Sequence, residues 1–176
     1  MTRRVLVAGI GNIFLGDDGF GVEVATRLVG RDVPEGVQVT DFGIRGLHLA
    51  YELLEGYDVL VLIDAMPFGE PPGTLVVLEP DPPAPPEEGD DVAPVVDAHS
   101  MSPGVVLSML AGLGGSVDRI VVIGCQPGSL EEGIGLTDAV AAAVDGAVDL
   151  CLEVLSELFA TVGPAAGSPS GKEVPG

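Results

Sequence analysis

Short apolar runs in this chain alternate with longer segments in which apolar residues recur at helical spacing. The runs predict five strands, over residues 4–9, 37–42, 58–63, 74–78 and 120–124. The periodic segments predict four helices, over residues 20–29, 47–54, 102–113 and 137–161. Because strands and helices alternate, the pattern favours an open α/β sheet with helices on both faces. Ligands of such folds bind beyond the carboxyl ends of the strands, so functional residues are expected there.

The apolar positions also predict which side of each short helix is buried. Residues three or four apart share one side of a helix, and that side is expected to face the sheet. The predicted stripes are Val22, Ala25 and Val29 in the first helix, and Leu47, Tyr51 and Leu54 in the second.

The length of 176 residues suits one domain, which we expect to span residues 1–162. Residues 80–97 are rich in proline and acidic side chains, a composition that favours an exposed loop. Residues 163–176 are rich in Gly, Pro and Ser, so we expect a disordered tail.

Acidic residues greatly outnumber basic ones, with 27 Asp and Glu against 7 Lys and Arg, and the formal net charge is −20. Nucleic acid is therefore not expected as a partner, since phosphate binding needs a basic face. No apolar run approaches the ~20 residues of a membrane helix, and the first residues show no signal peptide. Cys125 and Cys151 lie in apolar contexts typical of core thiols in a reducing compartment. We expect a cytoplasmic protein without membrane contact.

Polar groups stand out where predicted strands end and helices begin. Asp64 directly follows an apolar strand, which sets its carboxylate at the open edge of the sheet. Asp17 and Asp18 precede a helix, where one carboxylate would serve as a cap but two exceed that need. His99 lies in a loop just before a helix capped by Ser102. Each has a plain alternative as a loop or capping residue, but together they suggest one imidazole and two carboxylates around a divalent metal. Ni, Zn, Fe and Mn all suit N and O ligands.

Other chemistry fits the sequence less well. Ser100 and Ser102 lie near His99, but the chain has no G-x-S-x-G turn. A dinucleotide site would need a third glycine where Phe14 stands, and a P-loop would need a lysine, whereas the only lysine is Lys172.

The segment Gly9–Gly21, with the sequence GIGNIFLGDDGFG, resembles the opening signature of the hydrogenase maturation proteases. These endopeptidases trim the C-terminus of the large subunit of [NiFe] hydrogenases. Further stretches agree with the family in order and spacing, and the resemblance covers about Val5 to Leu158. These stretches are Asp41–Leu47, Leu62–Ala65, His99–Ser102, Gly124–Pro127 and Gly135–Thr137.

The resemblance implies a three-layer α/β/α sandwich of phosphorylase/hydrolase-like type around a five-stranded, mostly parallel sheet. The strand over residues 74–78 would be the antiparallel one. It also implies a metal site formed by Asp18, Asp64 and His99, which would serve as both metal ligands and catalytic residues. The family has Glu or Asp at the position of Asp18. Asp41 and the backbone of residues 43–46 are weaker candidates for the same cleft.

The activity implied is removal of the C-terminal extension from the precursor of a [NiFe] hydrogenase large subunit after nickel insertion. The Ni²⁺ would be carried by this precursor, the expected partner, and another divalent metal is compatible with the same ligands. Two alternatives stay open at this point: a non-catalytic metal-binding assembly factor, and a small-molecule or nucleotide-binding α/β module.

Overall fold

The computed structural model describes residues 3–80 and 103–160 of the chain. The strands are β1 (Val5–Ile10), β2 (Val37–Gly43), β3 (Val59–Ala65), β4 (Leu75–Leu78) and β5 (Arg119–Cys125). The helices are the 3-10 helix η1 (Gly16–Gly19), α1 (Phe20–Leu28), α2 (Gly46–Leu53), α3 (Pro103–Gly112) and α4 (Asp138–Ala160). Each predicted strand and helix is present, with bounds that differ by at most two residues.

The five strands form one sheet in the order β2-β1-β3-β5-β4. The pairs β1–β2, β1–β3 and β3–β5 are parallel, whereas β4 is antiparallel to β5. This topology confirms the predicted mostly parallel sheet, including the antiparallel strand at its edge. Parallel neighbours need crossover connections, and the helices between the strands supply them.

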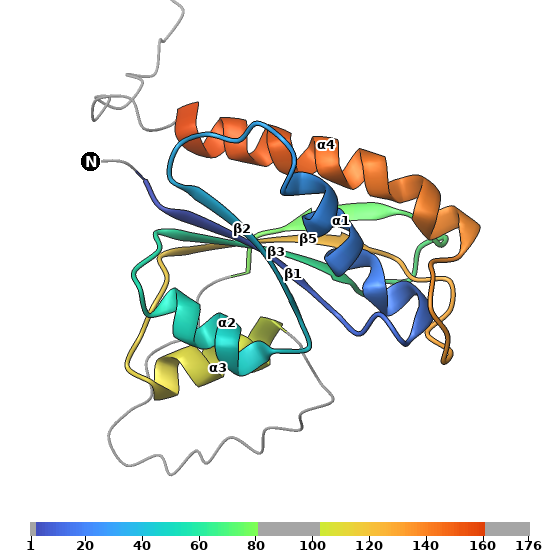
Figure 1. Ribbon diagram of the computed structural model, residues 1–176, viewed down its shortest axis with the longest axis horizontal. Coiled ribbons are helices and arrows are strands. Elements are labelled where there is room, and N and C mark those ends of the chain that lie inside the picture. Colours follow the sequence, from blue (N-terminus) through green and yellow to red (C-terminus); the bar gives the residue numbers. More distant parts are fainter. Residues whose placement is uncertain (1–2, 81–102, 161–176) are drawn as a thin grey trace, which may run out of the picture.

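Helices α1 and α4 cover one face of the sheet, and α2 and α3 cover the other (Figure 1). Side chains of a strand alternate between the two faces, so each face has its own core. In β1, Val5 and Val7 pack under α1 and α4, whereas Leu6 and Ile10 pack against the layer of α2 and α3. Burial on both faces explains why β1 and β3 are almost continuously apolar. The three-layer α/β/α sandwich is therefore confirmed.

The predicted buried side is partly right for α1 and wrong for α2. Helix α1 buries Ala25 as predicted, but Val29 is 65% exposed, and Val24 and Leu28 are buried beside Ala25. Helix α2 buries Leu49 and Leu53, and the whole predicted stripe Leu47, Tyr51 and Leu54 is exposed. Both sides of α2 carry apolar residues at helical spacing, so periodicity alone does not select the side that meets the sheet.

The helices begin toward the carboxyl edge of the sheet and run back toward its amino edge (Figure 1). The turn that carries η1 and the end of β3 lie together at this carboxyl edge. Within residues 3–80 and 103–160, no helix combines the length and apolarity needed to cross a membrane.

Candidate active site

Glycines allow the backbone of η1 and the beginning of α1 to pack closely against the edge of the sheet. Gly11 has a φ of 134°, and a Cβ there would collide with the carbonyl oxygen of Asp18. At Gly21, a Cβ would collide with the carbonyl oxygens of Ile10 and Ile63, at the ends of β1 and β3. Only glycine allows this approach of α1 to the two strands. The turn that carries Asp18 consequently lies beside the end of the strand that carries Asp64.

Asp18 is partly buried, and its carboxylate has a fixed partner. Its Oδ2 accepts a hydrogen bond of 2.7 Å from the backbone N–H of Asn12. This bond holds the side chain against the turn that follows β1. Asp18 is thus oriented by backbone that belongs to the same glycine-rich signature.

Asp64 lies on β3 at the carboxyl edge and is partly buried. By alternation it shares the sheet face of Leu60 and Leu62, which α2 and α3 cover. Burial raises its pKa from the usual 3.8 to about 8, and the negative charge of Asp18 adds to this, while a hydrogen bond from the Ala65 N–H lowers it. Asp64 is therefore a carboxyl group with too few donors for its burial, next to a second carboxylate. Such a donor set fits a divalent cation, whose charge compensates both groups.

Asp17, the neighbour of Asp18 in sequence, has a different environment. It is 0% exposed, and its carboxylate accepts four hydrogen bonds. The donors are Gly128 N–H (2.7 Å), Ser129 N–H (3.0 Å), Thr137 N–H (2.7 Å) and the Thr137 hydroxyl (2.8 Å). Burial alone would raise the pKa of Asp17, but the hydrogen bonds from Thr137, Ser129 and Gly128 lower it below 3.8. The pair of adjacent acids therefore divides into a buried anchor, Asp17, and a partly exposed group, Asp18.

A cleft of about 250 Å³ opens beside this edge, between the turns that follow β1 and β2. Its lining is Gly11, Asn12, Ile13, Phe14, Val22, Asp41, Phe42, Gly43, Ile44 and Arg45. Asp41 and residues 43–45 line this cleft, whereas Gly46 does not. Because the lining includes neither Asp18 nor Asp64, the expectation that Asp41 and residues 43–46 share a cleft with these two acids is not confirmed. Asn12 connects the cleft to Asp18, since its N–H donates to the Asp18 carboxylate.

His99 lies outside the described residues, as do the predicted tail 163–176 and all of the predicted loop 80–97 except Pro80. Helix α3 begins four residues after His99 and packs on the same sheet face as Asp64. Within the described ranges, no three His, Cys, Asp or Glu side chains gather in a metal-binding arrangement. The assignment of Asp18, Asp64 and His99 as a joint site therefore stays a prediction.

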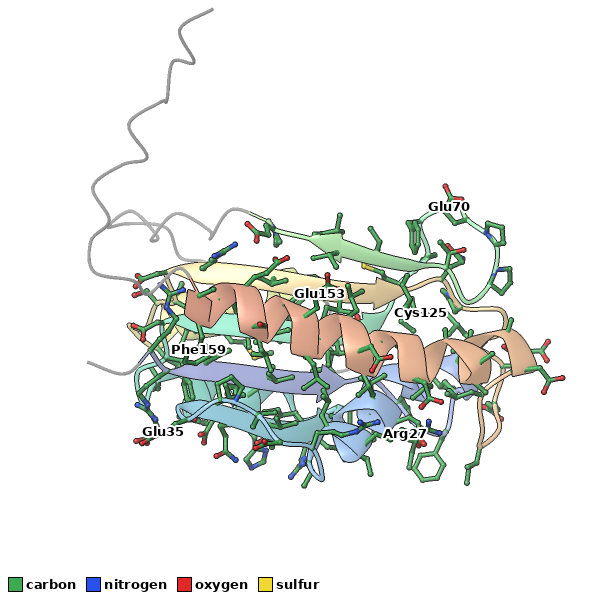
Figure 2. The ribbon with its side chains drawn as sticks, turned by 90° about the horizontal axis from the view of Figure 1, so that it is seen from above. Arg27, Glu35, Glu70, Cys125, Glu153 and Phe159 are labelled. Carbon is green, nitrogen blue, oxygen red and sulfur yellow. The ribbon has the colours of Figure 1, made fainter. Side chains whose placement is uncertain are left out.

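Two polar residues have structural roles at this edge that the sequence did not predict: Gln126 received no role, and Thr137 was expected only to cap the last helix. Gln126 follows β5, and its side-chain oxygen accepts the N–H of Phe68, 2.7 Å away, in the loop after β3. Thr137 precedes α4, and its hydroxyl donates to Asp17. Figure 2 shows the sheet edge they serve, with Cys125 at the end of β5 and Glu70 on the neighbouring loop. Their positions in the stretches 124–127 and 135–137 were the available signal.

Comparisons with known proteins agree with this fold. A family model described as hydrogenase maturation protease matches residues 22–154. The hydrogenase expression/formation protein HupD of Rhodobacter capsulatus is 37% identical over 153 residues, which cover 83% of this chain and 68% of the relative. The hydrogenase 2 maturation protease of Escherichia coli K12 is 33% identical over 161 residues, which cover 88% and 92%.

Solved structures lead to the same class. The hydrogenase maturating endopeptidase HybD from E. coli superposes with a TM-score of 0.68 at 31% identity, covering 88% of this chain and 93% of HybD. A hydrogenase 2 maturation peptidase from a Thaumarchaeota archaeon gives a TM-score of 0.65 at 33% identity, covering 87% and 98%. The fold and its relatives thus define an α/β endopeptidase. The chain belongs to the hydrogenase maturation protease family, which favours an enzyme over the two alternatives considered from sequence.

Proposed function

We propose that this chain removes the C-terminal extension of a [NiFe] hydrogenase large-subunit precursor once nickel has been inserted. Asp18, Asp64 and His99 contact the nickel that the precursor carries, or a divalent metal beside it. The observation that carries the proposal is the close packing at Gly11 and Gly21, which holds the turn of Asp18 beside the end of the strand that carries Asp64.

The electrostatics of the two acids give the site its selectivity. Asp64 keeps its proton at neutral pH while no cation is near, because burial disfavours its ionised form and the negative charge of Asp18 adds to this effect. A precursor without metal has no cation that could take the place of that proton on Asp64. A precursor loaded with nickel compensates both carboxylates, so binding discriminates between immature and metal-loaded substrate.

The remaining parts of the edge supply positioning. The cleft lined by Asp41 and Ile44 lies next to Asp18 and accommodates the peptide of the extension. The guanidinium of Arg45 donates to the carbonyl oxygens of Asp41 (2.6 Å) and Phe42, which fixes the wall of the cleft. A divalent cation held by such ligands supplies Lewis acidity for attack of water on a carbonyl. Asp64 and Asp18 are the groups available to orient that water or to accept its proton.

The reaction belongs in the cytoplasm under this proposal, together with the precursor as partner. The two cysteines support a reducing compartment, since Cys125 and Cys151 are both free and buried.

The test is a comparison of native protein with His99→Ala on nickel-loaded and nickel-free precursor, read by the mass of the large subunit. Native protein is expected to remove a C-terminal peptide from the nickel-loaded precursor alone. His99→Ala is expected to fold normally and to leave the mass unchanged. Trimming by His99→Ala at the native rate would refute the ligand assignment. Binding of native protein without any mass loss would indicate an assembly factor that does not cut.

A further inference from the structure

Asp17 is the only charged side chain that is fully buried among residues 3–80 and 103–160. A buried carboxylate is costly unless donors surround it, and here the donors come from far along the chain. They belong to the segment between β5 and α4, more than a hundred residues away. The proposed reaction gives Asp17 no direct task, because no side of its carboxylate faces solvent.

Backbone pairing reinforces the same contact. The N–H of Asp17 donates to Ser129 O at 2.9 Å, and the N–H of Gly16 donates to Gly133 O at 2.9 Å. The N–H of Gly133 in turn donates to Phe14 O at 2.8 Å. The turn before α1 is therefore hydrogen-bonded to the segment 128–137 through several backbone groups.

The helical turn η1 needs this support. It has four residues and no side-chain cap at its beginning, and such a short 3-10 helix has little stability of its own. Asp18 lies inside η1, one residue after the anchor. Its position relative to β3 therefore depends on what holds the turn.

We infer that Asp17 is a positioning residue for Asp18, through which the segment 128–137 sets the geometry of the active site. The inference rests on the proposed function, in which Asp18 acts on the substrate's metal. Asp17 does not touch substrate in this account. It fixes the backbone of η1, while the N–H of Asn12 fixes the carboxylate of Asp18.

The bonding pattern explains why a carboxylate is needed. Oδ2 accepts three donors, from Gly128, Ser129 and the Thr137 hydroxyl, and Oδ1 accepts the N–H of Thr137. An amide of the same shape has one oxygen, so its NH₂ group must face at least one N–H donor. Asp17→Asn therefore breaks the anchor in either orientation, whereas Thr137→Val removes one donor of four.

The experiment compares Asp17→Asn with Leu155→Ala, a core variant on α4 that is far from the site and lowers global stability. Both are assayed on nickel-loaded precursor at a temperature where circular dichroism shows them folded. Asp17→Asn is expected to lower kcat on the order of 100-fold with little change in KM, since small misplacements of reacting groups have such effects. Leu155→Ala is expected to keep the native kcat.

A second readout does not depend on activity. Amide hydrogen exchange at Asn12 reports the bond to Asp18, and it is expected to accelerate in Asp17→Asn relative to amides of β3. In Leu155→Ala this ratio should stay native. Should Asp17→Asn fail to fold, Thr137→Val and Thr137→Ser replace it: the valine variant lowers kcat, and the serine variant, which keeps the hydroxyl, does not.

Equal kcat in Asp17→Asn and Leu155→Ala, with native exchange at Asn12, would overturn the inference, as would equal kcat in the two Thr137 variants. Asp18→Ala is assayed in parallel, so that a failure of the proposed function can be distinguished from a failure of the positioning role of Asp17. Full activity of Asp18→Ala contradicts the proposed function itself. Loss of activity in Asp18→Ala with normal kcat in Asp17→Asn contradicts only the positioning role.

Discussion

Two carboxyl groups at the same edge of the sheet, Asp17 and Asp64, have pKa values that are shifted in opposite directions. At the junction of η1 with the segment before α4, Asp17 is surrounded by four donors and its pKa is lowered. At the end of β3, Asp64 has the Ala65 N–H as a favourable partner and Asp18 as an unfavourable one, and its pKa is raised to about 8. Burial raises the pKa of both groups, so the difference comes from the hydrogen-bond donors around Asp17 and from the negative charge of Asp18 acting on Asp64.

The contrast separates a structural acid from a functional one. A carboxylate whose donors are complete stabilises its surroundings and has nothing left to offer a ligand. A carboxylate that lacks donors destabilises the fold while it is ionised, and a bound cation stabilises its ionised form. Mutation of Asp64 should therefore lower activity without lowering stability, whereas mutation of Asp17 should lower stability and, through the position of Asp18, activity as well.

The largest expected effect is on activity, in Asp64→Asn. In the proposed function Asp64 contacts the metal and the reacting water, so loss of its charge should lower processing of nickel-loaded precursor by roughly 100-fold or more. The folded state should be at least as stable as native at pH 8, because the variant carries no repelled charge. Precursor mass and thermal unfolding measure the two effects. A variant that both cuts normally and unfolds early would reverse the roles assigned to Asp64 and Asp17.

The second effect is on stability, in Asp17→Asn. Breaking a buried and fully bonded carboxylate should lower the free energy of unfolding by about 3 kcal/mol. Urea unfolding at neutral pH measures this loss, with Arg27→Ala as a control. Arg27 forms a surface ion pair with Asp145 at 2.6 Å, and its removal should cost less than about 1 kcal/mol. Equal losses in the two variants would mean that the donors around Asp17 contribute nothing special.

The pH dependence of stability should carry opposite signs at the two acids. In the unfolded chain Asp64 loses its proton near pH 4, but in the folded protein it keeps the proton to about pH 8. Across this window the folded state binds more protons, so its stability falls as pH rises. Asp17 has a lowered pKa, and the stability it confers is lost only as the pH falls below about 4.

Comparison of native protein with Asp64→Asn separates the pH dependence of stability that comes from Asp64 from that of the other acidic residues. The variant should gain stability relative to native between pH 5 and pH 8, by about 4 kcal/mol, because the folded native protein alone holds this proton over about three pH units. Chemical unfolding at the two pH values gives the difference. A gap that is constant or narrows with rising pH would show that Asp64 is ionised throughout.

The smallest effect concerns Thr137→Val, which removes one neutral donor and leaves three. Stability should fall by about 1 kcal/mol, the usual contribution of a single hydrogen bond. Thr137→Ser keeps the hydroxyl and should stay closer to native. If both variants lose the same amount, the methyl group rather than the hydrogen bond to Asp17 matters at this position.

The sequence predicts most of the fold because the physics is local. β1 and β3 are covered on both faces, so they appear as unbroken apolar runs, and glycine-rich turns mark where they end. The buried sides of α1 and α2 were not predictable from period alone. Leu47 and Leu49 belong to two competing stripes on α2, and only the packing against the sheet chooses between them.

The place of Asp64 in the fold was predictable for a related reason. The place of Asp64 follows from its strand, because a residue at the end of a parallel strand lies at the ligand-binding edge. The separation of Asp17 from Asp18 does not follow from sequence, since the donors to Asp17 come from Gly128, Ser129 and Thr137 after a long crossover. Neighbouring acids in one turn are equivalent until tertiary contacts distinguish them.

The most direct test of the central claim is a crystal structure of this protein with a divalent cation such as Ni²⁺ or Cd²⁺, located by anomalous scattering. The account predicts one strong peak at the carboxyl edge, about 2–2.5 Å from oxygen atoms of Asp18 and Asp64 and from a nitrogen of His99. A cation bound elsewhere, or an imidazole of His99 turned away from two carboxylates that lie more than about 10 Å apart, would contradict it, because ligand bonds cannot span such a gap.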